Sequence, residues 1–259
     1  MSKYKTAVGV AVLCALALSA FAAASASAKG LTAYTCVLGK GVLNGPHCLG
    51  TEGGEYGHVK IEEETTGIAT NAKTAENAAH ETTKAAQKSI LKGTLSGVAS
   101  EIECTGVEGS GTFNNKTTAG GEMFAHAEGT LTYTGCKMLK PAGCAVAATL
   151  TTNKLTGTTE GIQTAEPPHT AKIQPAGETP FIEIKTTGCT NEGLNQTYPV
   201  TGSLKAKITG ATLTSTHADI TTQNTLKFGG QKAGLDGALT LEAHSKAGEE
   251  THPLTVTTE

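Results

Sequence analysis

The sequence predicts a mainly β protein: an antiparallel β-sandwich or barrel-like sheet with at most one short helix and three disulfides. Three observations lead to this class. Threonine supplies 43 of the 231 residues that follow Ala28, and this β-branched residue suits a sheet face exposed to solvent. Short runs of alternating apolar and polar residues recur between glycine-rich turns, a pattern typical of antiparallel sheets. Six cysteines follow Ala28.

The first 28 residues have the pattern of an export signal. Two lysines give a short positive region, residues 7–24 are apolar, and the Ala-Ser-Ala of residues 26–28 suits a cleavage site. A retained membrane anchor is the alternative, because the apolar run approaches the roughly 17 residues that span a bilayer. We expect a signal peptide over residues 1–28, a single Thr/Gly-rich β-domain over residues 29–259, and a secreted, extracellular protein. No transmembrane segment is expected after signal cleavage.

The strand-like runs can be followed in chain order. They lie at residues 33–38, 56–62, 91–104, 130–134, 145–151, 181–186, 200–208, 225–228 and 235–241. Residues 71–88 differ, because they are rich in Ala, Glu, Lys and Gln, which favour a helix. The apolar stripe of that segment consists of small residues that bury little area. We therefore expect a short surface helix there, with an extended loop as the alternative.

An even number of cysteines in an exported chain indicates disulfides. The six candidates are Cys36, Cys48, Cys104, Cys136, Cys144 and Cys189. Because short loops close most readily, the spacing favours the pairs Cys36–Cys48 and Cys136–Cys144, which leaves Cys104–Cys189 as the long bridge. A zinc site is the rival interpretation, but zinc favours cysteines two to four residues apart, and no pair here has that spacing.

Composition argues against several classes of partner and cofactor. Residues 29–259 carry 18 lysines against 23 acidic residues, and the whole sequence has no arginine and no tryptophan. A nucleic-acid partner is therefore not expected, because it requires a basic patch and stacking aromatic rings. The eight histidines are scattered without an H-x-x-x-H pair, and the clustered Asp and Asn of a calcium loop are missing. We expect neither a metal site nor another cofactor.

Catalytic patterns are equally scarce. No G-x-S-x-G is present, and His217 and Asp219 are two residues apart, a spacing that more often gives a surface hydrogen bond. Glycoside or peptide hydrolysis would need carboxylates that converge on a cleft. Glu62, Glu101 and Glu103 are the candidates by residue type, although charge-rich runs are usually solvated faces.

Several short motifs resemble a group of uncharacterised secreted, cysteine-containing β-proteins of actinobacteria. They are Tyr34-Thr35-Cys36, Gly54-Glu55-Tyr56-Gly57-His58-Val59, Glu101-Ile102-Glu103-Cys104-Thr105 and Gly188-Cys189. The group has no established activity, so the resemblance implies localisation and fold rather than chemistry, and no site residue is assigned from it. Together with the composition, it favours a secreted non-enzymatic protein with a structural, adhesive or ligand-binding role. Its partner could be an extracellular polymer or the cell surface. The alternative is a secreted hydrolase acting on polysaccharide or peptide.

Overall fold

The computed structural model describes residues 31–43, 53–61, 65–71, 88–160, 169–209, 212–215, 225–244 and 251–258. In these ranges the chain forms strands β1 (Leu31–Leu43), β2 (Tyr56–Lys60), β3 (Thr65–Asn71), β4 (Ser89–Leu95), β5 (Val98–Cys104), β6 (Gly106–Thr117), β7 (Met123–Thr134), β8 (Lys137–Lys140), β9 (Thr149–Thr151), β10 (Leu155–Thr159), β11 (His169–Pro175), β12 (Ile182–Lys185), β13 (Thr197–Thr201), β14 (Leu204–Thr209), β15 (Thr212–Ser215), β16 (Lys227–Phe228), β17 (Gln231–Lys232), β18 (Gly234–His244) and β19 (Thr251–Thr258). The one helical element in them is a short 3-10 turn, η1 (Glu192–Leu194). The predicted signal peptide lies outside the described residues.

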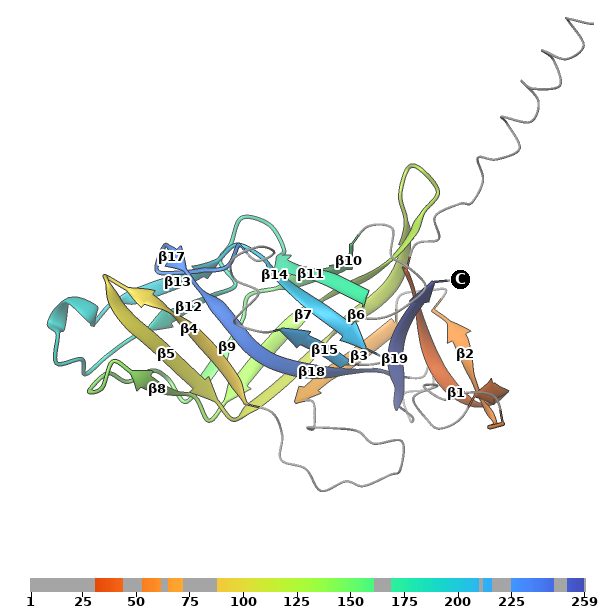
Figure 1. Cartoon of the computed structure of the whole chain (residues 1–259), viewed down its shortest axis with the longest axis horizontal. Helices are drawn as coiled ribbons and strands as arrows, with labels where there is room; N and C mark the ends of the chain where they lie inside the picture. The colour runs from red at the N-terminus through yellow and green to blue at the C-terminus, as the bar shows by residue number, and fades with distance from the viewer. Residues whose placement is uncertain are drawn as a thin grey trace, which may run out of the picture.

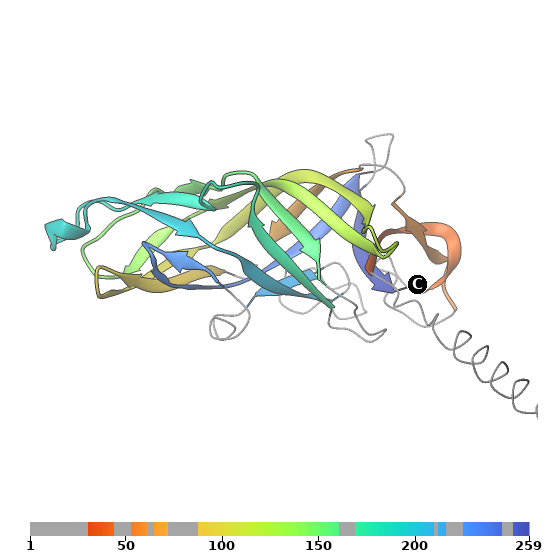
Figure 2. The ribbon, with the colours of Figure 1, turned by 90° about the horizontal axis from the view of Figure 1, so that it is seen from above.

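Eight strands pair in a ring. Their order is β15-β14-β11-β10-β7-β6-β3-β18, and β18 pairs with β15 to close it. Each of these pairs is antiparallel. Two views at right angles show the strands curling around the long axis of the molecule (Figures 1 and 2). The predicted mainly β, antiparallel class is confirmed, and the curled ring corresponds to the barrel-like form of that prediction.

The long strand β18 links the ring to further strands at both ends. Its first residues, 234–236, pair with β4, and its last residues, 242–244, pair with β19. From β19 the sheet continues to β1 and then to the edge strand β2 (Figure 1). At the opposite end, β4 pairs with β5 and β5 with β8. A separate sheet, β12-β13-β16-β17, contacts β4 there.

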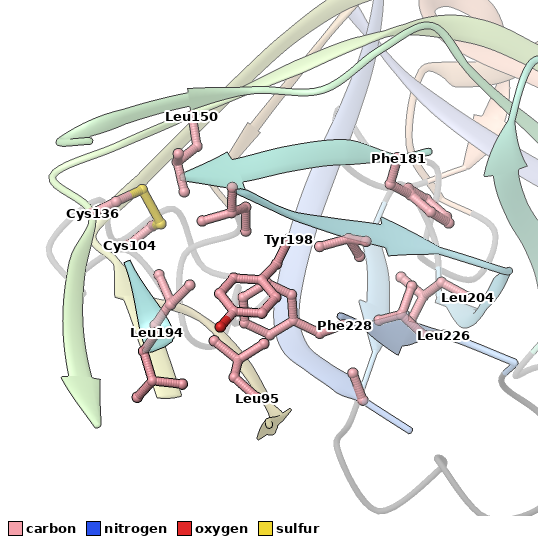
Figure 3. Packing of buried hydrophobic residues seen from close by; sticks show 14 of the residues in the cluster. Leu95, Cys104, Cys136, Leu150, Phe181, Leu194, Tyr198, Leu204, Leu226 and Phe228 are labelled. Carbon is pink, nitrogen blue, oxygen red and sulfur yellow. A yellow bond between two sulfur atoms is a disulfide. The ribbon is translucent and has the colours of Figure 1, made fainter. Parts of the chain in front are cut away.

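Each of the two ends has its own group of packed, buried residues. The larger group packs the separate sheet against β4 and β5 (Figure 3). At its centre the rings of Tyr198 and Phe228 meet edge to face, with centroids 6.0 Å apart, a geometry that aromatic pairs favour. The smaller group contains Ala33, Phe113 and Leu254. We call the region around the larger group the disulfide end, after the bridges described next. The region around the smaller group is the β1 end.

The disulfides correct the predicted pairing. Cys104 is bonded to Cys136, and Cys144 to Cys189, instead of Cys136–Cys144 and Cys104–Cys189. The physical reason is strand register. Gly106 pairs with Thr134 across β6 and β7, and Glu103 pairs with Lys137 across β5 and β8. One continuous register therefore sets Cys104 opposite Cys136, whatever the length of chain between them.

The third predicted bridge is described only in part. Cys36 takes part in a disulfide, but its predicted partner, Cys48, lies outside the described residues. Among the described cysteines, the structure gives the two bridges named above. The pairing Cys36–Cys48 stays a prediction.

Two predicted strands are also corrected, and the predicted helix over residues 71–88 lies almost wholly outside the described residues. Asn71, the first residue of the predicted helix, ends strand β3, and residues 72–87 lie outside the described part of the chain. The predicted strand at 145–151 shrinks to β9, with an isolated bridge from Ala145 to Thr187 before it. The predicted strand at 200–208 is divided into β13 and β14 at Gly202, which has a positive φ of 97°.

Candidate binding site: an apolar interior

Alternation along the ring strands directs one set of side chains into the ring. On β7 this inward set is Ala125, Ala127, Gly129, Leu131 and Tyr133. The alternate positions near the end of β7 are threonines on the outer face, where Oγ1 of Thr132 lies 3.2 Å from Oγ1 of Thr151 on β9. Near the end of β7, threonines therefore cover the outside of the sheet, while small and aliphatic residues line the inside.

Three adjoining apolar cavities follow one another along this interior. The first and second each measure about 100 Å³ and the third about 60 Å³. Leu213 of β15 lines all three. The first and second also share Leu131, Leu155, Ile173 and Leu239. The second and third also share Phe113, Ala127, Gly157 and Leu241. Because neighbouring cavities have common walls, they form a series that runs from the disulfide end to the β1 end.

The middle of the series is hollow because small residues occupy inward positions. Gly157 on β10 stands opposite Ala127 on β7, and both line the second and third cavities. A Cβ atom at position 157 would lie 3.7 Å from the Cβ of Ala127, an ordinary van der Waals contact. Gly111 and Gly129, which stand opposite each other on β6 and β7, differ from Gly157. A Cβ at either of them would clash with a backbone carbonyl oxygen of the neighbouring strand.

Strands β1 and β19 close the third cavity at the β1 end, where they contribute Ala33, Leu254 and Val256. The Asn115 side chain of β6 fixes this closure. Its Oδ1 accepts a hydrogen bond from the Ala33 amide at 2.7 Å, and its Nδ2 donates to the carbonyl oxygens of Ala33 at 3.0 Å and Ile61 at 2.7 Å. One amide group therefore joins β6 to β1 and to the residue that follows β2.

The few polar groups along the first cavity are hydroxyls. They belong to Ser89, Tyr133, Thr152 and Ser215. Burial raises the pKa of Tyr133 to about 12, so its hydroxyl stays neutral at any physiological pH. Thr152 Oγ1 accepts a hydrogen bond from the Leu131 amide at 2.9 Å. The first cavity therefore offers an apolar wall with a small number of neutral polar groups.

A charged cluster lies beside the second and third cavities. Glu128 on β7 forms ion pairs with Lys154 and with Nε2 of His126, the latter at 3.1 Å. The hydrogen bond from Lys154, followed by that from His126, lowers the pKa of Glu128 to about 2. A further histidine, His169, is buried at the start of β11, and burial lowers its pKa.

Lys154→Met should weaken the acid dependence of stability. Because the pKa of Glu128 is lower in the folded protein than its ordinary value of 4.5, the Glu128–Lys154 pair stabilises the fold above pH ~4.5, and this contribution is lost as the pH falls towards ~2. The side chain of Glu128 is 32% exposed, so the contribution is about 1 kcal/mol or less. Urea unfolding at several pH values should show a shallower decline for Lys154→Met than for Lys207→Met on the outer face of β14. Equal declines would contradict this assignment.

The predicted hydrolase carboxylates do not meet in a cavity. Glu101 and Glu103 alternate with Ile102 on β5, so they lie on the opposite face of that strand, where Glu103 is only 8% exposed beneath its lysine partners. Lys140 pairs with Glu101 at 3.3 Å, and Lys137 and Lys88 each pair with Glu103 at 3.2 Å. The hydrogen bonds from Lys137 and then Lys88 lower the pKa of Glu103. Glu62, the third candidate, lies outside the described residues, as do His217 and Asp219.

Comparisons with known proteins give no family. No protein-family model, curated protein or solved structure matches this chain. Within the described ranges, no helix is long and apolar enough to cross a membrane, and no three His, Cys, Asp or Glu side chains gather in a way that could hold a metal ion. The series of cavities is therefore the best-defined candidate site in the described part of the chain.

Sequence reasoning assigned none of these residues to a binding site. Gly157, Ser89 and Ser215 stand in runs of threonine, serine and glycine that resemble any exposed strand or turn. One signal was available in the segment from Leu155 to Thr159. Its glycine lies between threonines, at a position where a strand usually buries an aliphatic side chain. A glycine inside a strand often marks a place where something else comes close to the backbone.

Proposed function

We propose that this protein is a non-enzymatic binding protein that encloses a small, elongated apolar molecule inside its curled sheet. The observation that carries the proposal is the series of three adjoining apolar cavities between the disulfide end and the β1 end. Ligand sites in proteins are typically concave and mostly apolar, with a few polar groups that fix orientation. The interior of the ring has this composition.

The cavity volumes set the size of the ligand. A dry protein cavity of roughly 150 Å³ binds benzene, so the first two cavities of about 100 Å³ and the third of about 60 Å³ would together hold roughly ten carbon atoms on the same scale. Burial of that apolar surface supplies the affinity through the hydrophobic effect. The ligand must be long rather than round, because the cavities follow one another along the ring.

The binding role suits a location outside the cytosol. Cys104–Cys136 and Cys144–Cys189 are bridged, and disulfides persist mainly in oxidising compartments. The predicted export signal and the resemblance to secreted actinobacterial proteins support the same location. A hydrolase draws no comparable support, because Glu101 and Glu103 are engaged by lysines on the outer face.

The variant Gly157→Val should fold and lose binding. Its methyl groups would occupy the second and third cavities, and a Cβ at position 157 would lie an ordinary 3.7 Å from the Cβ of Ala127. Valine also favours an extended strand over the flexible unfolded chain, so the free energy of unfolding should rise by about 0.5–1 kcal/mol. Calorimetric titration with 1-octanol should show an affinity at least about tenfold lower than that of the unchanged protein, since the occupied space can no longer hold the alkyl chain.

Thr156→Val is the matched control. It introduces the same side chain on β10 at a neighbouring position that does not line any of the three cavities. Binding of 1-octanol should be unchanged in this variant. The proposal would be wrong if Gly157→Val folds and binds 1-octanol as tightly as Thr156→Val does, or if the unchanged protein binds neither 1-octanol nor an alkane or carboxylate of the same chain length.

A further inference from the structure

Two buried serine hydroxyls interrupt the aliphatic wall of the first cavity. Ser89 begins β4 and Ser215 ends β15, and each residue is only 6% exposed. Ser215 follows Leu213 at the next inward position of the same strand, and both line this cavity. The two serines come from segments far apart in the sequence, and β18 brings them together, since it pairs with β4 and with β15.

The Ser215 hydroxyl has no hydrogen-bond partner within the described part of the chain. Buried hydroxyls are almost always hydrogen-bonded, because leaving one unpaired costs the full desolvation of the group. An unpaired hydroxyl on the wall of an apolar cavity is therefore a group whose partner is expected to come from whatever fills that cavity.

A glycine brings the two serines close together. Gly237 stands opposite Ser215 across β15 and β18, and a Cβ atom at position 237 would lie 3.1 Å from Ser89 Oγ. That distance is tighter than an ordinary contact, so the absence of a side chain at Gly237 is what lets Ser89 pack against β18 next to Ser215. The unpaired Ser215 hydroxyl lines the first cavity itself, so an oxygen atom of a ligand in that cavity is the partner within its reach.

Charge restricts what that oxygen can be. Among the described residues that line the first cavity there is no lysine, histidine, aspartate or glutamate. Along the second cavity Glu128 is acidic and already paired with Lys154. A carboxylate buried here would lack a cation and would be strongly disfavoured, whereas a neutral oxygen needs only a hydrogen bond. The same lack of a general base argues against Ser215 as a nucleophile.

We infer that Ser215 donates a hydrogen bond to a neutral oxygen of the bound ligand, which makes the ligand an apolar alcohol, ester or ketone rather than a free carboxylic acid. This inference rests on the proposed function and adds the polar end of the ligand to it. The apolar part of the molecule then extends from the first cavity past Leu213 towards Gly157 and the β1 end.

Three probes of equal chain length test the inference: 1-octanol, octanoate and octane. The unchanged protein should bind 1-octanol more tightly than octanoate at pH 7, by about tenfold or more. In Ser215→Ala the dissociation constant of 1-octanol should rise about fivefold, the effect of one lost hydrogen bond. Octane, applied as vapour and followed by the thermal unfolding midpoint, should stabilise both proteins equally because it makes no hydrogen bond.

Stability without ligand gives a second readout. Ser215→Ala removes an unpaired buried hydroxyl, so its unfolding midpoint should be unchanged or higher. Ser203→Ala is the matched control, because Ser203 is equally buried but has its hydroxyl 2.9 Å from Thr225 Oγ1 and does not line the first cavity. That variant should lower the midpoint by about 3 °C and leave 1-octanol binding intact.

The outcomes separate the two proposals. If 1-octanol, octanoate and octane all fail to bind, the proposed function is wrong and the inference falls with it. If octane and 1-octanol bind but Ser215→Ala changes neither, the interior is a binding site and the role of Ser215 is overturned. The role of Ser215 is also overturned if octanoate binds as tightly as 1-octanol, or if Ser215→Ala lowers the unfolding midpoint in the way that Ser203→Ala does.

Discussion

Replacing Cys104 and Cys136 together by alanine should lower the free energy of unfolding by about 4 kcal/mol. The bridge closes a loop of 32 residues, and the chain-entropy model gives about 4 kcal/mol for a loop of that size. Both cysteines are buried in the group of residues that packs the disulfide end, so the substitution also removes packing there. Guanidinium unfolding under non-reducing conditions would measure the loss.

The bridge between Cys144 and Cys189 provides the comparison. Its loop of 45 residues is longer, but the entropy of loop closure grows only with the logarithm of length. The double alanine variant of this second bridge should therefore cost a similar amount, within about 1 kcal/mol. A loss of less than about 1 kcal/mol for the Cys104/Cys136 variant would show that strand pairing alone holds the disulfide end together.

The class of fold was predictable because threonine alternation is a local property. Residues 130–134 were predicted as a strand from their sequence alone, and they form the last part of β7 with threonines on its outer face. In contrast, β6 was missed between Gly106 and Thr117. Its glycines at 106, 109 and 111 suggest turns, whereas in the structure all three are strand residues, and those at 106 and 111 allow close approach to β7.

The disulfide pairing and the cavities were not predictable, because both depend on which strands become neighbours. Chain separation favoured Cys136–Cys144, but register places Cys104 opposite Cys136. Likewise, the first cavity needs Ser89 and Ser215 on either side of Gly237, a juxtaposition that only the ring closure by β15 and β18 creates. No local pattern in the sequence reports such long-range pairings.

Asn115→Asp should destabilise the protein by about 3 kcal/mol at pH 7. The aspartate keeps the shape of asparagine but loses both N–H donors. The Ile61 carbonyl oxygen then loses its bond from Asn115, the Ala33 carbonyl oxygen keeps only the bond from the Ile61 amide, and both face a negative charge. These backbone groups belong to residues that are only 1% and 4% exposed. Each buried group left without a partner costs about 1–3 kcal/mol. Urea unfolding of the variant and of the unchanged protein would measure the difference.

Asn153→Asp serves as the matched control for the Asn115→Asp substitution. The Asn153 amide makes a single exposed bond, 2.9 Å long, to the carbonyl oxygen of Pro180, so its loss should cost about 1 kcal/mol or less. Because Asn115 holds β1 over the third cavity, Asn115→Asp should also increase amide hydrogen exchange in β1 more than in β13, which lies at the disulfide end. Equal costs for the two variants, with unchanged exchange in β1, would show that β19 alone keeps the β1 end closed.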